Sequence, residues 1–300
     1  MSHFTAADVP SQSGKCFVVT GANTGIGLEA ARVLAARGGR VLLACRSEDK
    51  ARAAMARIAG ETPGADLAFL PLDQADLSSV RRAAELAAQE PRIDVLINNA
   101  GVMFPPLPRT AQGIELQFAV NHLGTFALTG LLLPKLAETP GSRVVVTASL
   151  AHKRGNIDFD DLRAEKSYSR TQRYSDSKLA NMLFFTELDR RLRKAGLPVS
   201  AIGCHPGVAA TEVMRYSGPF RVFTPLIGLL LNTAEKGAWP ALQAGCDPAA
   251  TGGDYYGAQH MGEMRGASGK ATRTQRSARE DLCQRLWQVS VELTGVDPGI

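Results

Sequence analysis

The stretch KCFVVTGANTGIGLEAARVLAARG, residues 15–38, contains an apolar run, a glycine-rich turn and a helical pattern in direct succession. The first run is apolar at consecutive positions, as expected for a strand that is buried on both faces of a parallel sheet. A strand that turns tightly into a helix is typical of a right-handed βαβ unit. This stretch therefore predicts an α/β protein.

The same alternation of apolar runs and helical patterns continues along the chain. The predicted strands are 15–21, 40–46, 66–73, 94–101, 141–149, 198–207 and 252–257, and the clearest helical patterns are 27–38, 76–89 and 179–196. Strands that alternate with helices predict a doubly wound open sheet, here with seven parallel strands flanked by helices. Ligands bind such sheets beyond the carboxyl ends of the strands, so candidate site residues are expected there.

The composition argues against several other classes of protein. The chain has 300 residues, 45% of them hydrophobic, which is enough for one sizeable core. Its net charge of +5 is mild and its arginines are spread out without interleaved aromatic residues, so no nucleic-acid partner is expected. No window approaches the roughly 18 uninterrupted apolar residues of a transmembrane helix. The N-terminal residues lack the apolar core of a signal peptide.

The five cysteines and five histidines show no metal-ligand spacing. The cysteines are scattered without a CxxC pair, which is typical of small buried side chains in a reducing compartment. We therefore expect a cytoplasmic protein that has neither a disulfide framework nor a metal site.

The turn after the first predicted strand has the features of a phosphate-binding loop. Gly21, Gly25 and Gly27 permit a tight turn and a close approach of the backbone to a pyrophosphate at a helix N-terminus. Glycines alone also fit an ordinary turn, but their place between a buried strand and a helix favours the phosphate site. The residues of the loop expected to contact a cofactor are Gly21, Asn23, Thr24, Gly25, Ile26 and Gly27.

The end of the second predicted strand indicates which dinucleotide is bound. The strand ends in Cys45 and is followed by Arg46, where NAD-binding domains usually carry an acid for the ribose hydroxyls. Arg46 can instead bind a 2′-phosphate through charge-assisted hydrogen bonds, so NADP(H) is favoured over NAD(H). The alternative is an exposed arginine that pairs with Glu48 or Asp49. Asp73 and Gln74, at the end of the third predicted strand, are further candidate cofactor contacts.

The segment TQRYSDSKLANMLFF, residues 171–185, places Tyr174 and Lys178 one helical turn apart on the same face. Neither is a natural core residue. Tyr174 can supply a proton to a carbonyl oxygen, but its free pKa of about 10 leaves the phenolate scarce at neutral pH. We expect the Lys178 ammonium to lower the pKa of that phenol by two to three units, which corresponds to roughly 3–4 kcal/mol. Ser149, at the end of the fifth predicted strand, could hold the same oxygen.

Five short motifs occur in order along the chain. They are TGANTGIG (20–27), NNAG (98–101), Ser149, YSDSK (174–178) and HPG (205–207). Together they resemble the short-chain dehydrogenase/reductase superfamily, and the match runs from about Gly14 to about Thr294. The segments 157–185 and 285–295 look more narrowly like the branch of retinol dehydrogenases, WW-domain-containing oxidoreductases and light-dependent protochlorophyllide reductases.

This resemblance implies a fold and a set of site residues. The fold is a single-domain Rossmann fold over residues 14–300, preceded by an N-terminal tail, 1–13. The catalytic residues are Tyr174 as acid/base, Lys178 as its tuner and a ribose ligand, Ser149 as substrate orienter and Asn121 as holder of a water. The remaining cofactor contacts are Asn99, Ala100 and Gly101 near the adenine ribose, and Pro206, Gly207, Val208 and Thr211 near the nicotinamide. Homodimers or homotetramers built on the helices that carry Asn121 and Tyr174 are also implied.

The apolar segment 212–232 lies where a substrate lid would be in such a sheet. If this segment is a lid, it predicts a hydrophobic alcohol, aldehyde or ketone as substrate. The same segment fits equally well as a helix that covers the core or as a dimer contact. Tyr168 is a rival acid, although Gln172 stands where its lysine would be. The favoured function is an NADP-dependent alcohol dehydrogenase or carbonyl reductase. The alternatives are a carbon–carbon double-bond reductase of the protochlorophyllide type and a non-catalytic cofactor-binding regulator.

Overall fold

The computed structural model describes residues 3–106, 109–208 and 232–300. The strands are β1 Cys16–Thr20, β2 Arg40–Cys45, β3 Leu67–Pro71, β4 Val95–Asn98, β5 Ser142–Thr147, β6 Val199–Cys204, β7 Tyr255–His260 and β8 Arg265–Lys270. The helices are α1 Gly25–Ala36, α2 Glu48–Glu61, α3 Leu77–Ala87, α4 Leu116–Phe118, α5 Gly124–Ala137, α6 Arg170–Lys194, α8 Ala234–Cys246 and α9 Glu280–Thr294. Shorter turns of helix are η1 Ala6–Asp8, η2 Ala119–Leu123, η3 Leu150–Arg154 and η6 Gln275–Ala278.

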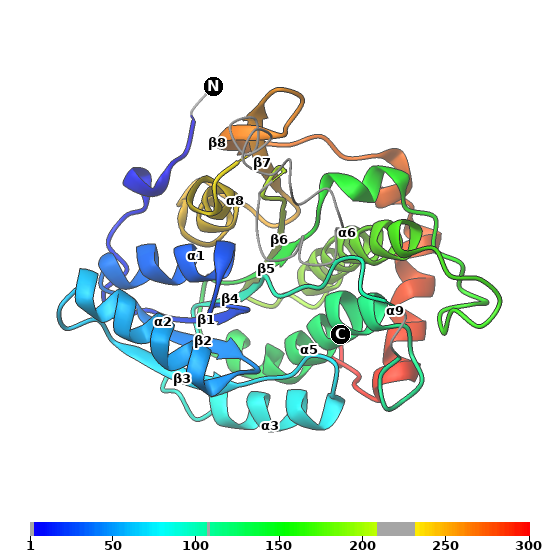
Figure 1. Ribbon diagram of the computed structural model, residues 1–300, viewed down its shortest axis with the longest axis horizontal. Coiled ribbons are helices and arrows are strands. Elements are labelled where there is room, and N and C mark those ends of the chain that lie inside the picture. The colour runs from blue at the N-terminus through cyan, green and yellow to red at the C-terminus, as the bar shows by residue number, and fades with distance from the viewer. Residues whose placement is uncertain (1–2, 107–108, 209–231) are drawn as a thin grey trace.

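All eight strands form one sheet in the order β3-β2-β1-β4-β5-β6-β7-β8 (Figure 1). Strands β1 to β7 pair in parallel, and β8 pairs antiparallel with β7. The chain order reverses between β1 and β4, which is the topological switch point where doubly wound sheets bind ligands. The predicted α/β fold is therefore confirmed, with one strand more than the seven predicted.

The sequence signal fails at the last two strands for local reasons. Strand β8 reads RGASGK and has no apolar run, because an antiparallel edge strand need not be buried on both faces. Strand β7 begins at Tyr255, three residues after the predicted start at 252. The residues before Tyr255 form a turn in which Gly253 has a φ of +82°.

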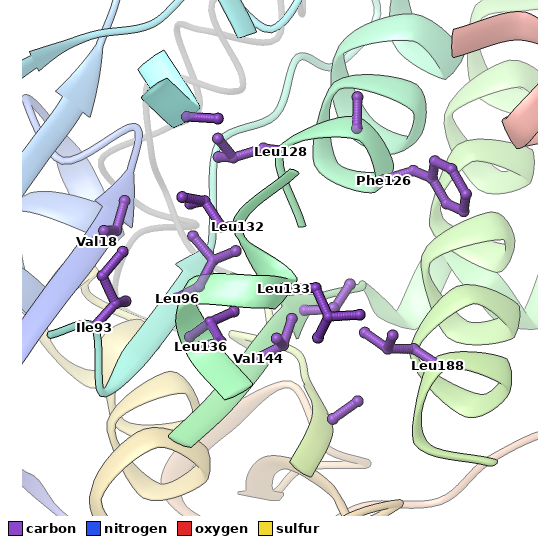
Figure 2. Packing of buried hydrophobic residues seen from close by; sticks show 14 of the residues in the cluster. Val18, Ile93, Leu96, Phe126, Leu128, Leu132, Leu133, Leu136, Val144 and Leu188 are labelled. Carbon is purple, nitrogen blue, oxygen red and sulfur yellow. The ribbon is translucent and has the colours of Figure 1, made fainter. Parts of the chain in front are cut away.

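Helices cover both faces of the sheet, α3, α5 and α6 on one side and α1, α2 and α8 on the other (Figure 1). Alternate residues of β1 face opposite layers. Val18 packs with the layer of α5 and α6, and Phe17 and Val19 pack with the layer of α1 and α8. This two-sided burial is why the strands are apolar at consecutive positions. Figure 2 shows the first of these layers, in which Leu132 and Leu136 lie beside Leu96.

The helical run Leu116–Ala137 is long and apolar enough to cross a membrane, with a mean hydropathy of 1.3. However, 89% of its most apolar window is buried inside the molecule, as in the core helix of a soluble protein. Its length and composition are therefore weak support for a membrane span.

Helix α9 packs against α6 and closes the core on that side. The Trp287 ring lies 5.2 Å from the Phe126 ring and 6.2 Å from the Phe184 ring, measured between centroids. The Arg191 guanidinium lies 4.3 Å from the Trp287 ring centroid. This face of α6 is thus occupied within the chain, and oligomerisation through it stays a prediction.

The described part of the predicted tail packs onto the domain. The backbone of Phe4 exchanges hydrogen bonds of 2.9 Å with Ser268 of β8 in both directions. Phe4 and Val9 are buried in the layer of α1 and α8. These residues therefore cover part of the sheet edge.

Candidate active site

A cleft of about 760 Å³ opens beyond the carboxyl ends of β1, β2, β4, β5 and β6. It lies at the switch point of the sheet, and its volume is within the usual range of ligand pockets. The predicted site residues that line it are Gly21, Asn23, Thr24, Gly25, Ile26, Arg46, Asp73, Gln74, Asn99, Ala100, Gly101, Ser149, Tyr174, Lys178, Pro206, Gly207 and Val208. Residues predicted from seven separate parts of the sequence therefore meet at one cleft.

The glycine-rich loop forms a narrow cradle at the start of α1. Gly21 and Gly25 have φ angles of +68° and +57°, which favour glycine. A Cβ atom added at Gly27 would lie 2.4 Å from the Gly21 carbonyl oxygen and 2.6 Å from Asn99 Nδ2. Gly27 does not line the cleft, so its contribution is to let α1 approach the β1 and β4 ends closely.

The N-terminus of α1 points its free amide groups toward the cleft. The first N–H groups of any helix lack partners within the helix. Thr24, the residue before α1, makes no capping hydrogen bond with its side chain to a described residue. These amides, together with the helix dipole, suit the phosphate groups of a dinucleotide.

Thr20 joins this loop to the end of β4. Its Oγ1 accepts hydrogen bonds of 2.9 Å from the backbone N–H groups of Asn99 and Ala100. Asn99 Nδ2 in turn donates to the Thr20 carbonyl oxygen at 2.9 Å. The NNAG motif is thus fixed against the glycine-rich loop by hydrogen bonds that do not involve a ligand.

Arg46 lies at the open end of the cleft, with 79% of its side chain exposed. Its Nη1 atom is 3.7 Å from Asp73 Oδ2. The alternative partner Glu48 is engaged by Arg52 at 2.5 Å. Lys50, in the first turn of α2, also lines the cleft, as Arg46 does. Two cations at this end suit an extra phosphate.

Gln74 is a predicted cofactor contact with a buried side chain, which is only 5% exposed. Its Nε2 donates to the Val120 carbonyl oxygen at 3.3 Å and to Thr125 Oγ1 at 3.1 Å. The amide nitrogen is therefore committed to η2 and the start of α5, and a role in binding the cofactor stays a prediction.

Ser149, Tyr174 and Lys178 meet at the end of β5. Ser149 directly follows this strand and caps η3, where its Oγ accepts from the Ala151 N–H at 3.2 Å. Tyr174 and Lys178 lie in the first turns of α6, as the spacing predicts. Lys178 Nζ is 5.9 Å from the centroid of the Tyr174 ring and donates to the Thr147 carbonyl oxygen at 3.1 Å.

Asn121 lies in η2, a short π-helical turn that precedes α5. Its Oδ1 accepts from the Val102 N–H at 2.7 Å, and its Nδ2 donates to the Val102 carbonyl oxygen at 3.0 Å and to Ser177 Oγ at 2.9 Å. Asn121 does not line the cleft. Its side chain joins the segment after NNAG to α6, and the water-holding role stays a prediction.

Pro206 and Gly207 of the HPG motif form another part of the cleft wall. Gly207 has a φ of +73°, and a Cβ atom there would lie 2.3 Å from the Met264 carbonyl oxygen. The Val208 N–H donates to the same oxygen at 2.8 Å, and Asn232 Nδ2 donates to the Pro206 carbonyl at 2.9 Å. The turn between β7 and β8 thus holds this wall in place. Thr211 and the predicted lid over 212–232, apart from Asn232, lie outside the described residues.

The family model described as short chain dehydrogenase matches residues 15–221. The chain belongs to this family. It is therefore an oxidoreductase that acts on CH–OH groups and binds a nicotinamide cofactor.

Relatives within the short-chain dehydrogenase family cover nearly the whole chain. Human retinol dehydrogenase 13 is 42% identical over 98% of this chain and 90% of its own. Human retinol dehydrogenase 12 is 42% identical over 94% of this chain and 87% of its own. The predicted nearness to the retinol dehydrogenase branch is confirmed.

Solved structures of the short-chain dehydrogenase fold resemble this chain as well. The crystal structure of an uncharacterized protein from Mycobacterium paratuberculosis is 38% identical, with a TM-score of 0.83 and full coverage of both chains. A short-chain dehydrogenase from Burkholderia cenocepacia, solved in complex with NADP, is 24% identical over 78% of this chain and 91% of its own, with a TM-score of 0.62. At that identity the second likeness concerns the fold alone.

The electrostatics of this short-chain dehydrogenase site differ from the sequence prediction. Burial raises the pKa of the Tyr174 phenol above its ordinary value, and a hydrogen bond with Ser149 lowers it only in part. Burial also lowers the pKa of Lys178 to about 8. The predicted lowering of the Tyr174 pKa by Lys178 is therefore wrong for this arrangement. The reason is that burial deprives the phenolate of water, while the Lys178 amine is hydrogen-bonded to the Thr147 carbonyl oxygen.

The rival tyrosine lies outside the cleft lining. Tyr168 donates its hydroxyl hydrogen to the Pro105 carbonyl oxygen at 3.1 Å. It therefore fixes a loop, while Tyr174 faces the cleft.

Several cleft residues were missed by the sequence analysis. Among them are Lys50, Met103, Phe104, Leu150 and Arg154. Lys50 lies in the first turn of α2, four residues after Arg46, and nothing in the sequence pattern marks it as a cleft residue. The others lie in η3 and in the loop after β4, where no periodicity indicates which side chains face the cleft.

Proposed function

We propose that this short-chain dehydrogenase is an NADP(H)-dependent enzyme that interconverts a hydrophobic alcohol and its aldehyde or ketone. The observation that carries the proposal is the convergence of Ser149, Tyr174 and Lys178 on one cleft with the glycine-rich loop. The relatives named retinol dehydrogenases support an alcohol and a carbonyl compound as the substrate pair. Apolar side chains that line the cleft, such as Met103, Phe104 and Val208, support a hydrophobic substrate.

The residues of the cleft fit a dinucleotide. The cradle left by Gly27 and the free amides at the start of α1 suit a pyrophosphate, and Arg46 with Lys50 suits a 2′-phosphate. A bound nicotinamide supplies the hydride, and Pro206 to Val208 would border its ring. Preference for NADP(H) rests on the two cations at the open end.

In the direction of reduction, Tyr174 donates its phenolic proton to the carbonyl oxygen of the substrate. Ser149 donates a hydrogen bond to the same oxygen and stabilises the negative charge that develops there. The ammonium of Lys178, one helical turn from the phenol, stabilises the phenolate that the proton transfer leaves. Because the hydrogen bonds of Lys178 and Asn121 are made within the protein, these groups are in place before substrate arrives.

The raised pKa of Tyr174 favours reduction at neutral pH. A phenol whose pKa lies above its ordinary value is protonated at pH 7 and can act as the acid. Oxidation of an alcohol needs the phenolate instead, so it should become faster as the pH rises. The protonated phenol is the form that carbonyl reduction requires, so the site is ready for reduction near neutral pH.

The test is a screen of NADPH oxidation with a panel of aldehydes, ketones and retinoids, run in the dark and again under illumination, and repeated with NADH. We expect NADPH consumption with hydrophobic carbonyl compounds and an alcohol as the product, identified by mass spectrometry and NMR. A saturated carbonyl product would instead favour the alternative, a carbon–carbon double-bond reductase. Tight NADPH binding without turnover on any compound of the panel would favour a cofactor-binding regulator.

A further inference from the structure

Phe104 has an unfavourable backbone conformation at the wall of the cleft. Its φ is +55°, a region that residues with a side chain rarely adopt. Four described residues other than glycine have a positive φ, and of these only Phe104 lines the cleft. Such strain persists only where the surroundings fix it, and it is often found at functional sites.

A buried glutamine fixes this conformation. Gln117, which has no exposed surface, accepts a hydrogen bond from the Phe104 N–H at 2.9 Å through Oε1. Its Nε2 donates to the Arg170 carbonyl oxygen at 3.1 Å. Its own N–H is bonded to Glu115 Oε1 at 3.0 Å, which holds the start of α4. Gln117 therefore links the loop after β4 to the first residue of α6.

This link sets the position of the Phe104 ring relative to Tyr174. Tyr174 lies one helical turn after Arg170 in α6. The Phe104 and Tyr174 ring centroids are 5.5 Å apart at an interplanar angle of 74°, an edge-to-face contact. Both side chains line the cleft. The ring thus forms the wall directly beside the proposed proton donor.

Two further contacts join the same segments. Tyr168 donates to the Pro105 carbonyl oxygen at 3.1 Å, next to Phe104 in sequence. Arg109 donates to the carbonyl oxygens of Arg163 and Ala164, both at 3.0 Å. The segment after β4 and the segment before α6 therefore act as one wall.

We infer that Phe104 determines substrate specificity by favouring flat, conjugated or aromatic carbonyl compounds over flexible aliphatic ones, and that Gln117 is its positioning residue. This inference rests on the proposed function, because it assumes that the substrate carbonyl is held at Tyr174. A rigid ring can stack on a planar substrate without ordering rotatable bonds in either partner. An aliphatic chain gains less from the ring and loses more conformational entropy on binding.

The first test compares kcat/KM for trans-cinnamaldehyde and for nonanal at saturating NADPH. For Phe104→Ala we expect a loss of about 3- to 10-fold with cinnamaldehyde, the size of one aromatic contact, carried mainly by KM. With nonanal we expect a loss of less than about twofold, because an aliphatic chain gains less from the ring than a planar conjugated substrate does. Phe104→Leu keeps most of the apolar volume and should show the same selective loss, which covers the case in which the alanine variant does not fold.

Phe159→Ala is the matched control. Phe159 is also partly buried, its ring lies 4.5 Å from the Arg285 guanidinium, and it does not line the cleft. This variant should leave the ratio of the two kcat/KM values unchanged. An unchanged ratio in an active Phe104 variant would overturn the assignment of Phe104. Absence of turnover of both aldehydes by the wild type would instead contradict the proposed function, and this inference with it.

Gln117→Met tests the positioning role, since it removes both side-chain hydrogen bonds while keeping a side chain of similar length. We expect the same selective loss as in Phe104→Ala, and no further loss when the two changes are combined, because both act through one ring. Equal losses with both aldehydes, or additive losses in the double variant, would show that Gln117 acts only on the general structure.

Thermal unfolding tests the strain directly. Phe104→Gly and Phe104→Ala remove the same ring, but only glycine adopts a positive φ without strain. We expect the glycine variant to melt about 2 °C higher than the alanine variant. At Phe159, whose φ is not positive, the glycine variant should melt lower than the alanine variant. A melting temperature of Phe104→Gly no higher than that of Phe104→Ala would contradict the inference that the backbone is strained at Phe104.

Discussion

Gly27→Ala should weaken cofactor binding without changing any group that contacts the substrate. The added methyl group would lie 2.4 Å from the Gly21 carbonyl oxygen, 2.6 Å from Asn99 Nδ2 and 2.8 Å from the Gly21 carbonyl carbon. All of these atoms belong to backbone or to a side chain that is already hydrogen-bonded to Thr20. None can move away alone, so α1 or the glycine-rich loop must shift.

The size of the effect follows from these distances. An ordinary van der Waals contact of a methyl carbon begins near 3.4 Å, so the loop must move by about 1 Å. Overpacking of this kind typically costs about 1–3 kcal/mol of folding stability. Because the same loop forms the phosphate cradle, a displacement of about 1 Å should weaken cofactor binding by about 10- to 100-fold.

The assay is the dissociation constant for NADPH, measured by titrating the fluorescence of the bound nucleotide, together with the melting temperature. Gly60→Ala is the control, because Gly60 lies in α2 and a Cβ atom there meets nothing within 4 Å. It should leave NADPH binding unchanged and raise stability by up to about 1 kcal/mol, the helix propensity difference. Wild-type NADPH affinity in Gly27→Ala would refute the assignment of this loop as the phosphate cradle.

Three further predictions use the charged and titrating groups. Arg46→Asp should weaken NADPH binding by at least about tenfold and NADH binding by much less, and equal losses in the two titrations would remove the basis for NADP preference. The rate of carbonyl reduction should fall as the pH rises through about 8, where Lys178 loses its charge. Lys178→Arg should move this fall to higher pH, and an identical pH profile in that variant would contradict the role of the ammonium. Burial lowers the pKa of His122 to about 3, so between pH 6.5 and 3 the unfolded state binds a proton that the folded state does not. The free energy of unfolding, measured with urea, should therefore decrease by about 1.4 kcal/mol for each pH unit below about 6 because of this group. His122→Gln should reduce that slope, and equal slopes in the two proteins would contradict the buried neutral imidazole.

The parallel strands and their ends could be predicted because both faces of the sheet are covered. Residues such as Phe17, Val18 and Val19 are then all apolar, and a strand stands out as a continuous run. The carboxyl ends of neighbouring parallel strands meet at one edge, which is why Ser149 could be assigned to the site from its place after a strand, whereas Asn99 was assigned through the family resemblance. Helical spacing alone placed Tyr174 and Lys178 together.

The surroundings of these groups could not be predicted, because their partners are distant in sequence. The amine of Lys178 is bonded to Thr147, 31 positions away, and the amide of Gln74 is bonded to Val120, 46 positions away. Such contacts decide whether a pKa rises or falls and whether a side chain faces the cleft or the core. The wall formed by Phe104 was missed for the same reason.

Some sequence predictions stay untested. Thr211 and the substrate lid, apart from Asn232, fall in residues 209–231, outside the described residues. The cytoplasmic location and the oligomeric state also stay predictions.

Tyr174→Phe tests the central claim most directly, because it removes one oxygen atom from the proposed proton donor and leaves the ring beside Phe104. Turnover of a carbonyl compound and the dissociation constant for NADPH are measured on the same preparation. We expect the rate of carbonyl reduction to fall by about 10²- to 10⁴-fold while NADPH binds within about twofold of the wild type. Undiminished reduction by this variant would show that the proton comes from another group.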